Sequence, residues 1–209
     1  MRAPQTEAFK RWFRQSVVRN ADGTPKVVFH GTTAVAFDEF RPFYRKGEQL
    51  GFGIGHFAES LDFAARYAFA EDVARKGKGE ARVYSVYLSI QTPLVAPAIV
   101  TEGTTEFALA KKFAGNRLLT QTDSQGRKVA YLQNAIDKAP GKRAESIIRD
   151  AGYDGVVYEA ILQQRDAYGS TRTGESLSWI VFEPWQVKSV DNVGTFDSRS
   201  GSILNGWRR

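Results

Sequence analysis

Apolar and polar positions alternate most clearly over residues 82–90, where every second side chain is apolar. This period of two predicts a strand with one apolar face. That face carries Tyr84, Val86, Leu88 and Ile90. Shorter apolar runs rich in β-forming residues predict further strands. These runs cover residues 26–30, 154–158, 178–182 and 186–190.

Helical patterns occupy the N-terminus and the centre of the chain. Thr6 is a suitable N-cap for a helix that ends near Arg14, and Ser60 is a suitable N-cap for a helix that runs to about Lys76. Residues 98–150 are expected to be mostly helical. Strands therefore cluster at the two ends of the chain with helices between them, an order that favours an α+β fold over an alternating α/β fold.

Three segments are predicted to be irregular. Residues 37–55 hold five glycines or prolines, and residues 163–176 are polar and contain glycine, so we expect the second segment to be a mobile loop. The chain after residue 192 is expected to be an irregular tail. The length suits one domain, 1–209, in which about 98–145 form a helical insertion and about 192–209 form the tail.

Composition restricts the chemistry. The 209 residues carry a net charge of +6, two histidines and no cysteine. The lack of cysteine excludes disulfides, thiolate metal sites and a cysteine nucleophile, and with two histidines we expect no metal site. No apolar stretch approaches a membrane span and the N-terminus has no signal-peptide pattern, so we expect a cytoplasmic protein with no membrane partner. The positive charge suits either a solvated surface or an anionic partner.

The first candidate site is His30-Gly31-Thr32, at the end of a predicted buried strand. An imidazole at this place could bond a ribose hydroxyl, and Thr32 offers a hydroxyl of its own. Gly31 has no Cβ, so a ligand amide could lie against its backbone. A purely structural histidine at a strand end is the alternative explanation.

A second candidate is the glycine-rich turn around Gly53, His56 and Phe57, followed by Tyr67 on the next predicted helix. Alternate glycines suggest a backbone that passes close to a ligand, although their spacing and the lack of a preceding apolar strand do not fit a dinucleotide fingerprint. An aromatic ring such as that of Tyr67 could stack on a planar ligand. A flexible turn and a core tyrosine are the alternatives.

The third candidate is the predicted strand that contains Ser178, together with the acids near it. A carboxylate beside a ribose stabilises the positive charge that develops when a glycosidic bond breaks. Glu175 and Glu159 are the nearest acids in sequence. Each alone could equally be a surface glutamate.

Together these segments resemble ADP-ribosyltransferases of the diphtheria-toxin and poly(ADP-ribose)-polymerase type, and more narrowly the branch found in polyvalent proteins of phages and in phage-derived toxin domains. The resemblance rests on the order of five motifs. They are Phe29-His30-Gly31-Thr32, Gly53-Ile54-Gly55-His56-Phe57-Ala58, Ala65-Arg66-Tyr67-Ala68, Gly152-Tyr153-Asp154-Gly155-Val156 and Ile180-Val181-Phe182-Glu183-Pro184. It covers nearly the whole chain, and the insertion is its least recognisable part.

The resemblance implies two small, mostly antiparallel sheets that form an NAD cleft. It implies catalytic roles for His30 and Tyr67, with NAD also contacting Gly31, Thr32, Gly53, His56, Phe57 and Ser178. Two positions depart from the family, because His56 replaces an expected tyrosine and Ser178 replaces the expected glutamate. We therefore expect Glu175 to supply the acid, with Glu159 as its competitor.

The function implied is mono-ADP-ribosylation of a protein or nucleic-acid acceptor with NAD as substrate, in a phage effector or toxin domain that could have an immunity partner. The acceptor would enter beside residues 163–176. Two alternatives stay open. One is a weakly active or inactive module that binds NAD or a partner. The other is an NAD-dependent RNA 2′-phosphotransferase, which would need several basic residues around the cleft.

Overall fold

The computed structural model describes residues 4, 6–42, 44–45, 48–49, 53–75, 80–96, 99–136, 138–139, 141–165, 171–192 and 194–204. Its helices are α1 (Glu7–Phe13), α2 (Leu61–Arg75), α3 (Thr105–Ala114), α4 (Leu132–Ile136) and α5 (Gly141–Asp150), with 3-10 turns η1 (Gly115–Arg117) and η2 (Pro184–Gln186). Its strands are β1 (Val28–Thr32), β2 (Tyr44–Arg45), β3 (Glu48–Gln49), β4 (Gly55–Ala58), β5 (Arg82–Leu88), β6 (Pro93–Ala96), β7 (Ile99–Thr101), β8 (Gln121–Thr122), β9 (Lys128–Tyr131), β10 (Gly155–Arg165), β11 (Thr171–Val181) and β12 (Val187–Ser189).

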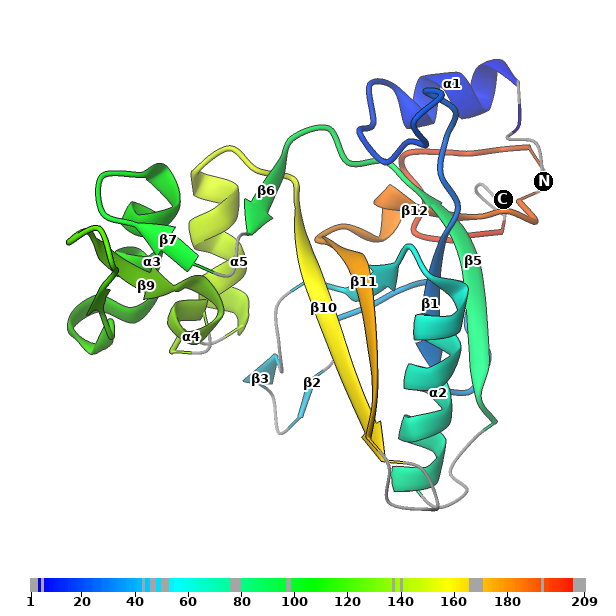
Figure 1. Cartoon of the computed structure of the whole chain (residues 1–209). Coiled ribbons are helices and arrows are strands. Elements are labelled where there is room, and N and C mark those ends of the chain that lie inside the picture. Colours follow the sequence, from blue (N-terminus) through cyan, green and yellow to red (C-terminus); the bar gives the residue numbers. More distant parts are fainter. Residues whose placement is uncertain are drawn as a thin grey trace.

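The main sheet has seven strands in the order β12-β5-β1-β4-β11-β10-β6. All its neighbours are antiparallel except β10 and β6, which run parallel. Figure 1 shows this sheet beside a smaller group formed by β7, β9 and α3 to α5. The α+β class and the mostly antiparallel strands are confirmed. The two sheets are unequal, however, because the second one, β7-β9-β8, has only three short strands.

Helix α2 lies against one face of β1 and β5, and its position follows from its sequence. The hydroxyl of Ser60 accepts a hydrogen bond from the Phe63 amide at 3.1 Å, which confirms Ser60 as the N-terminal cap. Ala64 and Ala68 are buried on the side that faces the sheet. Their small side chains allow the helix backbone to approach the strands closely.

Three apolar clusters hold the sheet. The first joins the insertion helices to Leu94, Val156 and Ile180 of the main sheet. The second fills the face of the main sheet that carries Val28, Val86, Phe57 and Trp179. The third packs α1 on Tyr87 through Phe9, Trp12 and Phe13, and Thr6 caps that helix as predicted, accepting from the Phe9 amide at 3.2 Å.

The insertion is less helical than its sequence indicates. The predicted helices are present as α3 and α5, but residues 99–131 also form the three-stranded sheet. Its strands have two to four residues, which is too short for a period of two to appear in the sequence.

The prediction of a mobile loop over residues 163–176 is wrong for residues 163–165 and 171–176, which are strand, while residues 166–170 lie outside the described residues. Strands β10 and β11 have eleven residues each and pair without interruption from Gly155–Val181 to Arg165–Thr171. The described part of the segment is therefore the far end of a long hairpin (Figure 1). In its outer half, the described side chains of one face are exposed, and those of the other face, Leu162 and Gly174, are only partly buried beside α2. Polar and apolar residues therefore do not alternate there as they do in a half-buried strand.

The C-terminal segment is irregular, as predicted, but it is held in place by a buried lysine. Lys188 is fully buried, and its ammonium donates to the carbonyls of Ser200 and Ser202 at 2.7 Å each. Ser202 in turn forms a bridge to Glu39. The tail thereby supports the loop that precedes β2. Within the described residues, no helix has the length and apolar character of a membrane span.

Candidate functional site

A cleft of about 1350 Å³ opens between the main sheet, α2 and α4. Its walls include most of the residues singled out in the sequence. Those residues are His30, Gly31, Thr32, Gly53, His56, Tyr67, Glu159 and Ser178. Segments that lie far apart in the chain therefore meet at one cavity.

His30 is the central residue of β1 and not its end as predicted, and it is half-buried at the wall of the cleft. Its Nδ1 is 2.8 Å from the carbonyl oxygen of His56, which can only accept a hydrogen bond. We therefore assign the proton to Nδ1 and the acceptor lone pair to Nε2. The rings of Phe40 and Phe57 pack against the imidazole at centroid distances of 5.0 and 5.5 Å. These contacts fix both the tautomer and the orientation of the ring.

His56 forms a pair with Tyr158, a residue that the sequence reasoning did not single out. Its Nδ1 lies 2.8 Å from the phenol oxygen of Tyr158, and the two rings are perpendicular. Removal of the imidazole from bulk water, and secondarily the charge of the nearby His30, lower the pKa of His56 to about 4. Part of the His56 side chain is exposed in the open cleft. The imidazole is nevertheless neutral at pH 7.

This shift predicts an acid-sensitive fold. Between pH 6.5 and about 4 the unfolded chain protonates His56 while the folded chain does not, so stability should rise with pH across that window and fall as the pH drops through it. We expect a His56→Gln variant, which has no titrating group here, to show a shallower decline. Urea unfolding of both proteins at pH 7 and pH 4.5 checks this, and equal declines would contradict it.

Tyr158 and Tyr67 close one side of the cleft. Burial raises the pKa of Tyr158 to about 12, and the neighbouring Tyr67 phenol adds to the shift. Tyr67 is 50% exposed on α2 and lines the cleft. Because Tyr158 is paired directly opposite Ser178, the two tyrosines, His56 and Ser178 make a polar but uncharged wall.

Close packing requires glycine at two positions of the site, Gly31 and Gly53. An ideal Cβ on Gly31 would lie 1.9 Å from the carbonyl oxygen of Ala64, so this position lets α2 approach β1. Gly53 has a φ of +76° and a Cβ there would lie 2.3 Å from Ile180. Its amide donates to Glu145 of α5 at 3.3 Å. Thr32 accepts a hydrogen bond from the amide of Ala34 at 3.1 Å.

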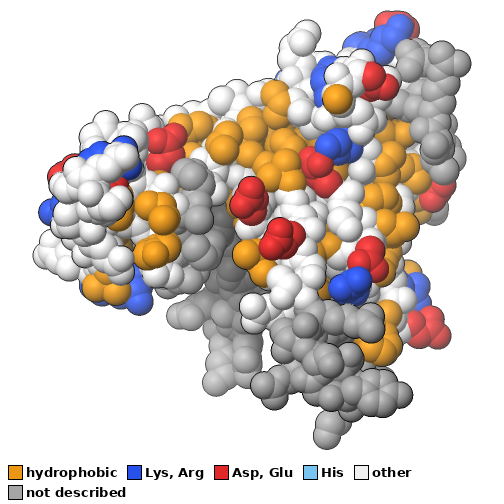
Figure 2. Space-filling model, viewed as in Figure 1, with side chains coloured by type: hydrophobic (Ala, Val, Ile, Leu, Met, Phe, Trp, Pro, Cys, Tyr) orange, Lys and Arg blue, Asp and Glu red, His pale blue; other side chains and the backbone are white. Residues whose placement is uncertain are grey.

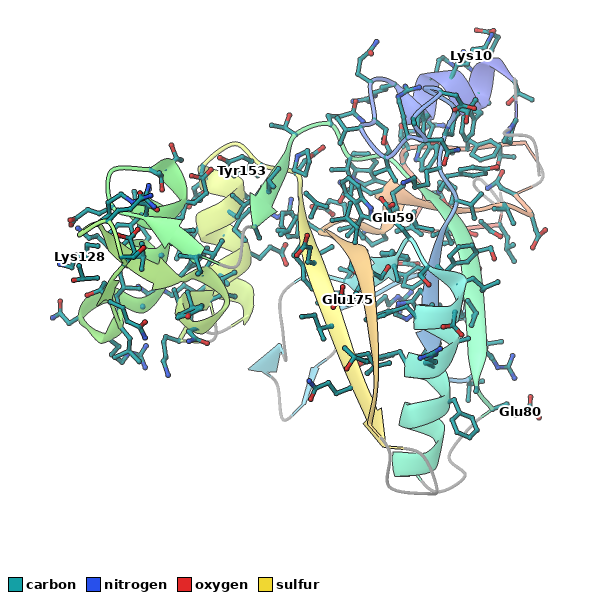
Figure 3. All side chains as sticks on the ribbon, viewed as in Figure 1. Lys10, Glu59, Glu80, Lys128, Tyr153 and Glu175 are labelled. Atoms are coloured by element: carbon teal, nitrogen blue, oxygen red, sulfur yellow. The ribbon has the colours of Figure 1, made fainter. Side chains whose placement is uncertain are left out.

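Two of the predicted site residues do not reach the cleft. Phe57 is fully buried in the core and contacts His30 from behind, so it supports the histidine and is not a wall of the cavity. Glu175 is exposed in the middle of β11 (Figure 3), and regular alternation puts it on the opposite face from Ser176 and Ser178. Residues 171–176, which were expected to be a loop that turns Glu175 inward, belong to β11.

Glu159 and Glu39 are the carboxylates among the described residues of the cleft wall. Glu39 forms an ion pair with Arg41 at 3.2 Å. Glu159 is exposed near the point where β10 leaves β6, and it makes no ion pair within the described part of the chain. Arg41 is the basic residue among the described cleft-lining residues.

Other residues of the motifs have structural partners outside the cleft. The carboxylate of Asp154 accepts from the amides of Gln91 and Thr92 at 2.8 Å each. The buried Gln186 accepts from the amide of Phe182 and donates to the carbonyl of Asp154. Part of the sequence signature therefore maintains the frame around the site.

The chain matches one protein family. The family model described as "ADP-Ribosyltransferase in polyvalent proteins" matches residues 20–196, which span β1 to β12 and contain every cleft residue named above. No curated protein and no solved structure is significantly similar to the chain.

Proposed function

Since the chain belongs to the family of ADP-ribosyltransferases in polyvalent proteins, we propose that it cleaves NAD between nicotinamide and ribose and transfers ADP-ribose to a macromolecular acceptor. The observation that carries this proposal is the meeting of His30, His56, Tyr67 and Ser178 around one cleft. A phage effector or toxin domain, acting in a bacterial cytoplasm and paired with an immunity partner, is the setting that we propose for it.

The size and lining of the cleft support NAD as the substrate. Its volume of about 1350 Å³ exceeds the roughly 300–1,000 Å³ of common small-molecule pockets. We place a ribose hydroxyl at His30, the nicotinamide amide along the Gly31 backbone and the nicotinamide ring on Tyr67. His56 and Tyr158 would face the nicotinamide ribose from the opposite wall.

The reaction needs negative charge near that ribose. The bond between ribose C1′ and the nicotinamide nitrogen breaks, its electrons stay with nicotinamide, and C1′ gains positive charge until the acceptor nucleophile bonds to it and loses its proton. His56, Tyr158 and Ser178 are all neutral at pH 7. Glu159 is on the same face of the hairpin as Glu175, but unlike Glu175 it lines the cleft, and it makes no ion pair among the described residues. It is therefore our choice for the acid, in place of Glu175.

The binding roles predict distinct mutant phenotypes. His30→Ala should weaken NAD binding by about 1–3 kcal/mol, because a polar partner is left unsatisfied. Tyr67→Phe should bind NAD as the parent does and Tyr67→Ala should not, because the ring face supplies a contact worth about 1 kcal/mol beyond burial. Calorimetric titration with NAD measures all three. Equal losses in both Tyr67 variants would assign the contact to the hydroxyl.

The proposed activity is tested with NAD labelled separately on nicotinamide and on adenosine. We expect the parent protein to release nicotinamide and to transfer the adenosine label to bacterial macromolecules, and the His30→Ala variant to do neither at the same NAD concentration. Digestion of the labelled product with protease or nuclease identifies the acceptor class. Binding of NAD without release would reject the activity.

A non-catalytic module that binds NAD is the second candidate. It is favoured by one observation, the buried neutral Ser178 where the family has a glutamate. The RNA 2′-phosphotransferase alternative has less support, because Arg41 is the basic residue that the described cleft wall offers and it is paired with Glu39.

A further inference from the structure

On the β10–β11 hairpin, acidic and apolar side chains are paired across the two strands beside the cleft. Glu159 is directly opposite Leu177, and Ile161 is directly opposite Glu175. Directly paired residues of antiparallel strands share a face, so these four side chains, hereafter the hairpin face, form one patch. Ile161 is 64% exposed and Leu177 is 41% exposed. Figure 2 shows acidic and hydrophobic side chains next to each other at the centre of the viewed side.

The hairpin face is continuous with the candidate site. Glu159, Ile161 and Leu177 all line the cleft. Val95 of β6, which is also 64% exposed and lines the cleft, extends the apolar surface next to Val157. A molecule that lies on this face therefore reaches the opening through which the acceptor must approach.

The charge of the hairpin face is opposite to that of the chain. The protein has a net charge of +6, yet both charged residues of the face are glutamates without an ion pair in the part of the chain that the structure describes. Two unpaired carboxylates repel a phosphate backbone and attract lysine or arginine. The face is thus complementary to a basic polypeptide and unsuited to a nucleic acid.

The backbone beside the hairpin face offers a second mode of recognition. Strand β6 pairs with β10 only as far as Tyr158, so within the described residues the outer edge of β10 has no strand beside it from Glu159 onward. An open edge of this kind can take up an extended peptide as an added strand, whose side chains then alternate in direction. A nucleic acid cannot form this pairing.

We propose, on the basis of the transferase function proposed above, that the acceptor is a protein, and that it docks on the hairpin face and the open edge of β10 through an extended segment. Every second side chain of this segment is on the side of the hairpin face, and these side chains are basic and apolar in turn. The apolar ones lie against Ile161 and Leu177 and a basic one reaches Glu175, while Glu159 stays available to the ribose. The acceptor nucleophile then stands at the mouth of the cleft.

Direct binding tests this proposal without relying on catalysis. The probes are a fluorescent 12-residue peptide that carries lysine and valine in turn at every second position with threonine between them, the same peptide with glutamate for lysine, and a single-stranded RNA of similar length. By fluorescence anisotropy we expect the lysine peptide to bind and the other two not to bind. Methylation of every second backbone amide of the lysine peptide should abolish binding, because it removes the donors for the edge of β10.

Two variants locate the docking surface. Glu175→Lys should weaken binding of the lysine peptide by about fivefold to tenfold and allow the glutamate peptide to bind. Ile161→Ser should weaken both. The matched controls are Glu7→Lys on α1 and the exposed Leu119→Ser in the insertion, which make the same chemical changes elsewhere and should leave binding unchanged.

Three outcomes would overturn the proposal. The first is binding of RNA that becomes stronger in the Glu175→Lys variant. The second is binding of the lysine peptide that neither hairpin variant changes. The third is a dimer, detected by light scattering, in which a second copy of the chain occupies the edge of β10. Nicotinamide release without any peptide is measured in parallel and should be the same in the parent and in the Glu175→Lys variant, because Glu175 does not line the cleft. If the parent protein releases no nicotinamide, the transferase function is rejected. The docking surface is tested separately, by peptide binding alone.

Discussion

Replacing Gly31 by alanine is expected to destabilise the protein by about 3 kcal/mol or more, a large share of the stability of a domain of this size. The added Cβ would lie 1.9 Å from the carbonyl oxygen and 2.8 Å from the carbonyl carbon of Ala64. Both atoms belong to the backbone of α2, so no side-chain rotation relieves the clash. Helix α2 must move away from β1, and Tyr67 moves with it.

Thermal unfolding of the Gly31→Ala variant measures this effect, and Gly174→Ala is the matched control. Gly174 also faces α2, but its ideal Cβ meets its nearest neighbour, Phe63, at 3.7 Å, an ordinary contact. The control should therefore unfold close to the parent temperature. An unchanged unfolding temperature for Gly31→Ala would mean that α2 does not lie on β1 as described.

The elements that the sequence predicted well are those with strong local signals. The caps Thr6 and Ser60 are side chains that bond an amide three residues later, so the helix start is determined within one turn. The strand at residues 82–88 forms where the period of two predicts it, and Val86 and Leu88 of its apolar face are buried, although α1 also buries Tyr87 on the other face. Such features depend on neighbours in the chain, and a single sequence contains them in full.

The long hairpin was missed because it carries little local signal. Residues 161–175 contain glutamine, arginine, threonine and glycine, and the described side chains of this stretch are mostly exposed. The pairing that makes them strands comes from the register between β10 and β11, in which Ile161 meets Glu175. That register cannot be predicted from composition. Because the pairing was not predicted, Glu175 was wrongly expected to turn into the cleft.

The site was predicted in part for the same reason. His30, His56 and Tyr67 each stand in a recognisable motif, and the structure brings all three to one cleft. Tyr158 forms a hydrogen bond with a histidine 102 residues away in the chain, and no local sequence pattern around Tyr158 predicts that contact. The only available signal was its place in a predicted strand next to Glu159.

Replacing Glu159 by glutamine is expected to lower the rate of nicotinamide release by about 100-fold to 1,000-fold while NAD still binds. The amide keeps the shape of the side chain but removes the charge that opposes the positive ribose. Glu175→Gln should change the rate less than about twofold, because that carboxylate does not line the cleft, whereas Glu159 does. Release is measured by single-turnover kinetics and NAD affinity by calorimetry.

The Ser178→Glu substitution separates a misplaced acid from a missing one. Ser178 is buried directly opposite Tyr158, so a carboxylate there could accept a hydrogen bond from the phenol and restore the charge that the family places at this position. If Glu159 is the acid, Ser178→Glu should recover part of the release lost in the Glu159→Gln background and add little in the parent. If Glu159→Gln has no effect and Ser178→Glu alone creates activity, the parent protein binds NAD in an intact cleft that lacks its acid. Should Glu175→Gln be the sensitive variant instead, the assignment of the acid to Glu159 is wrong and the reaction takes place farther along the hairpin.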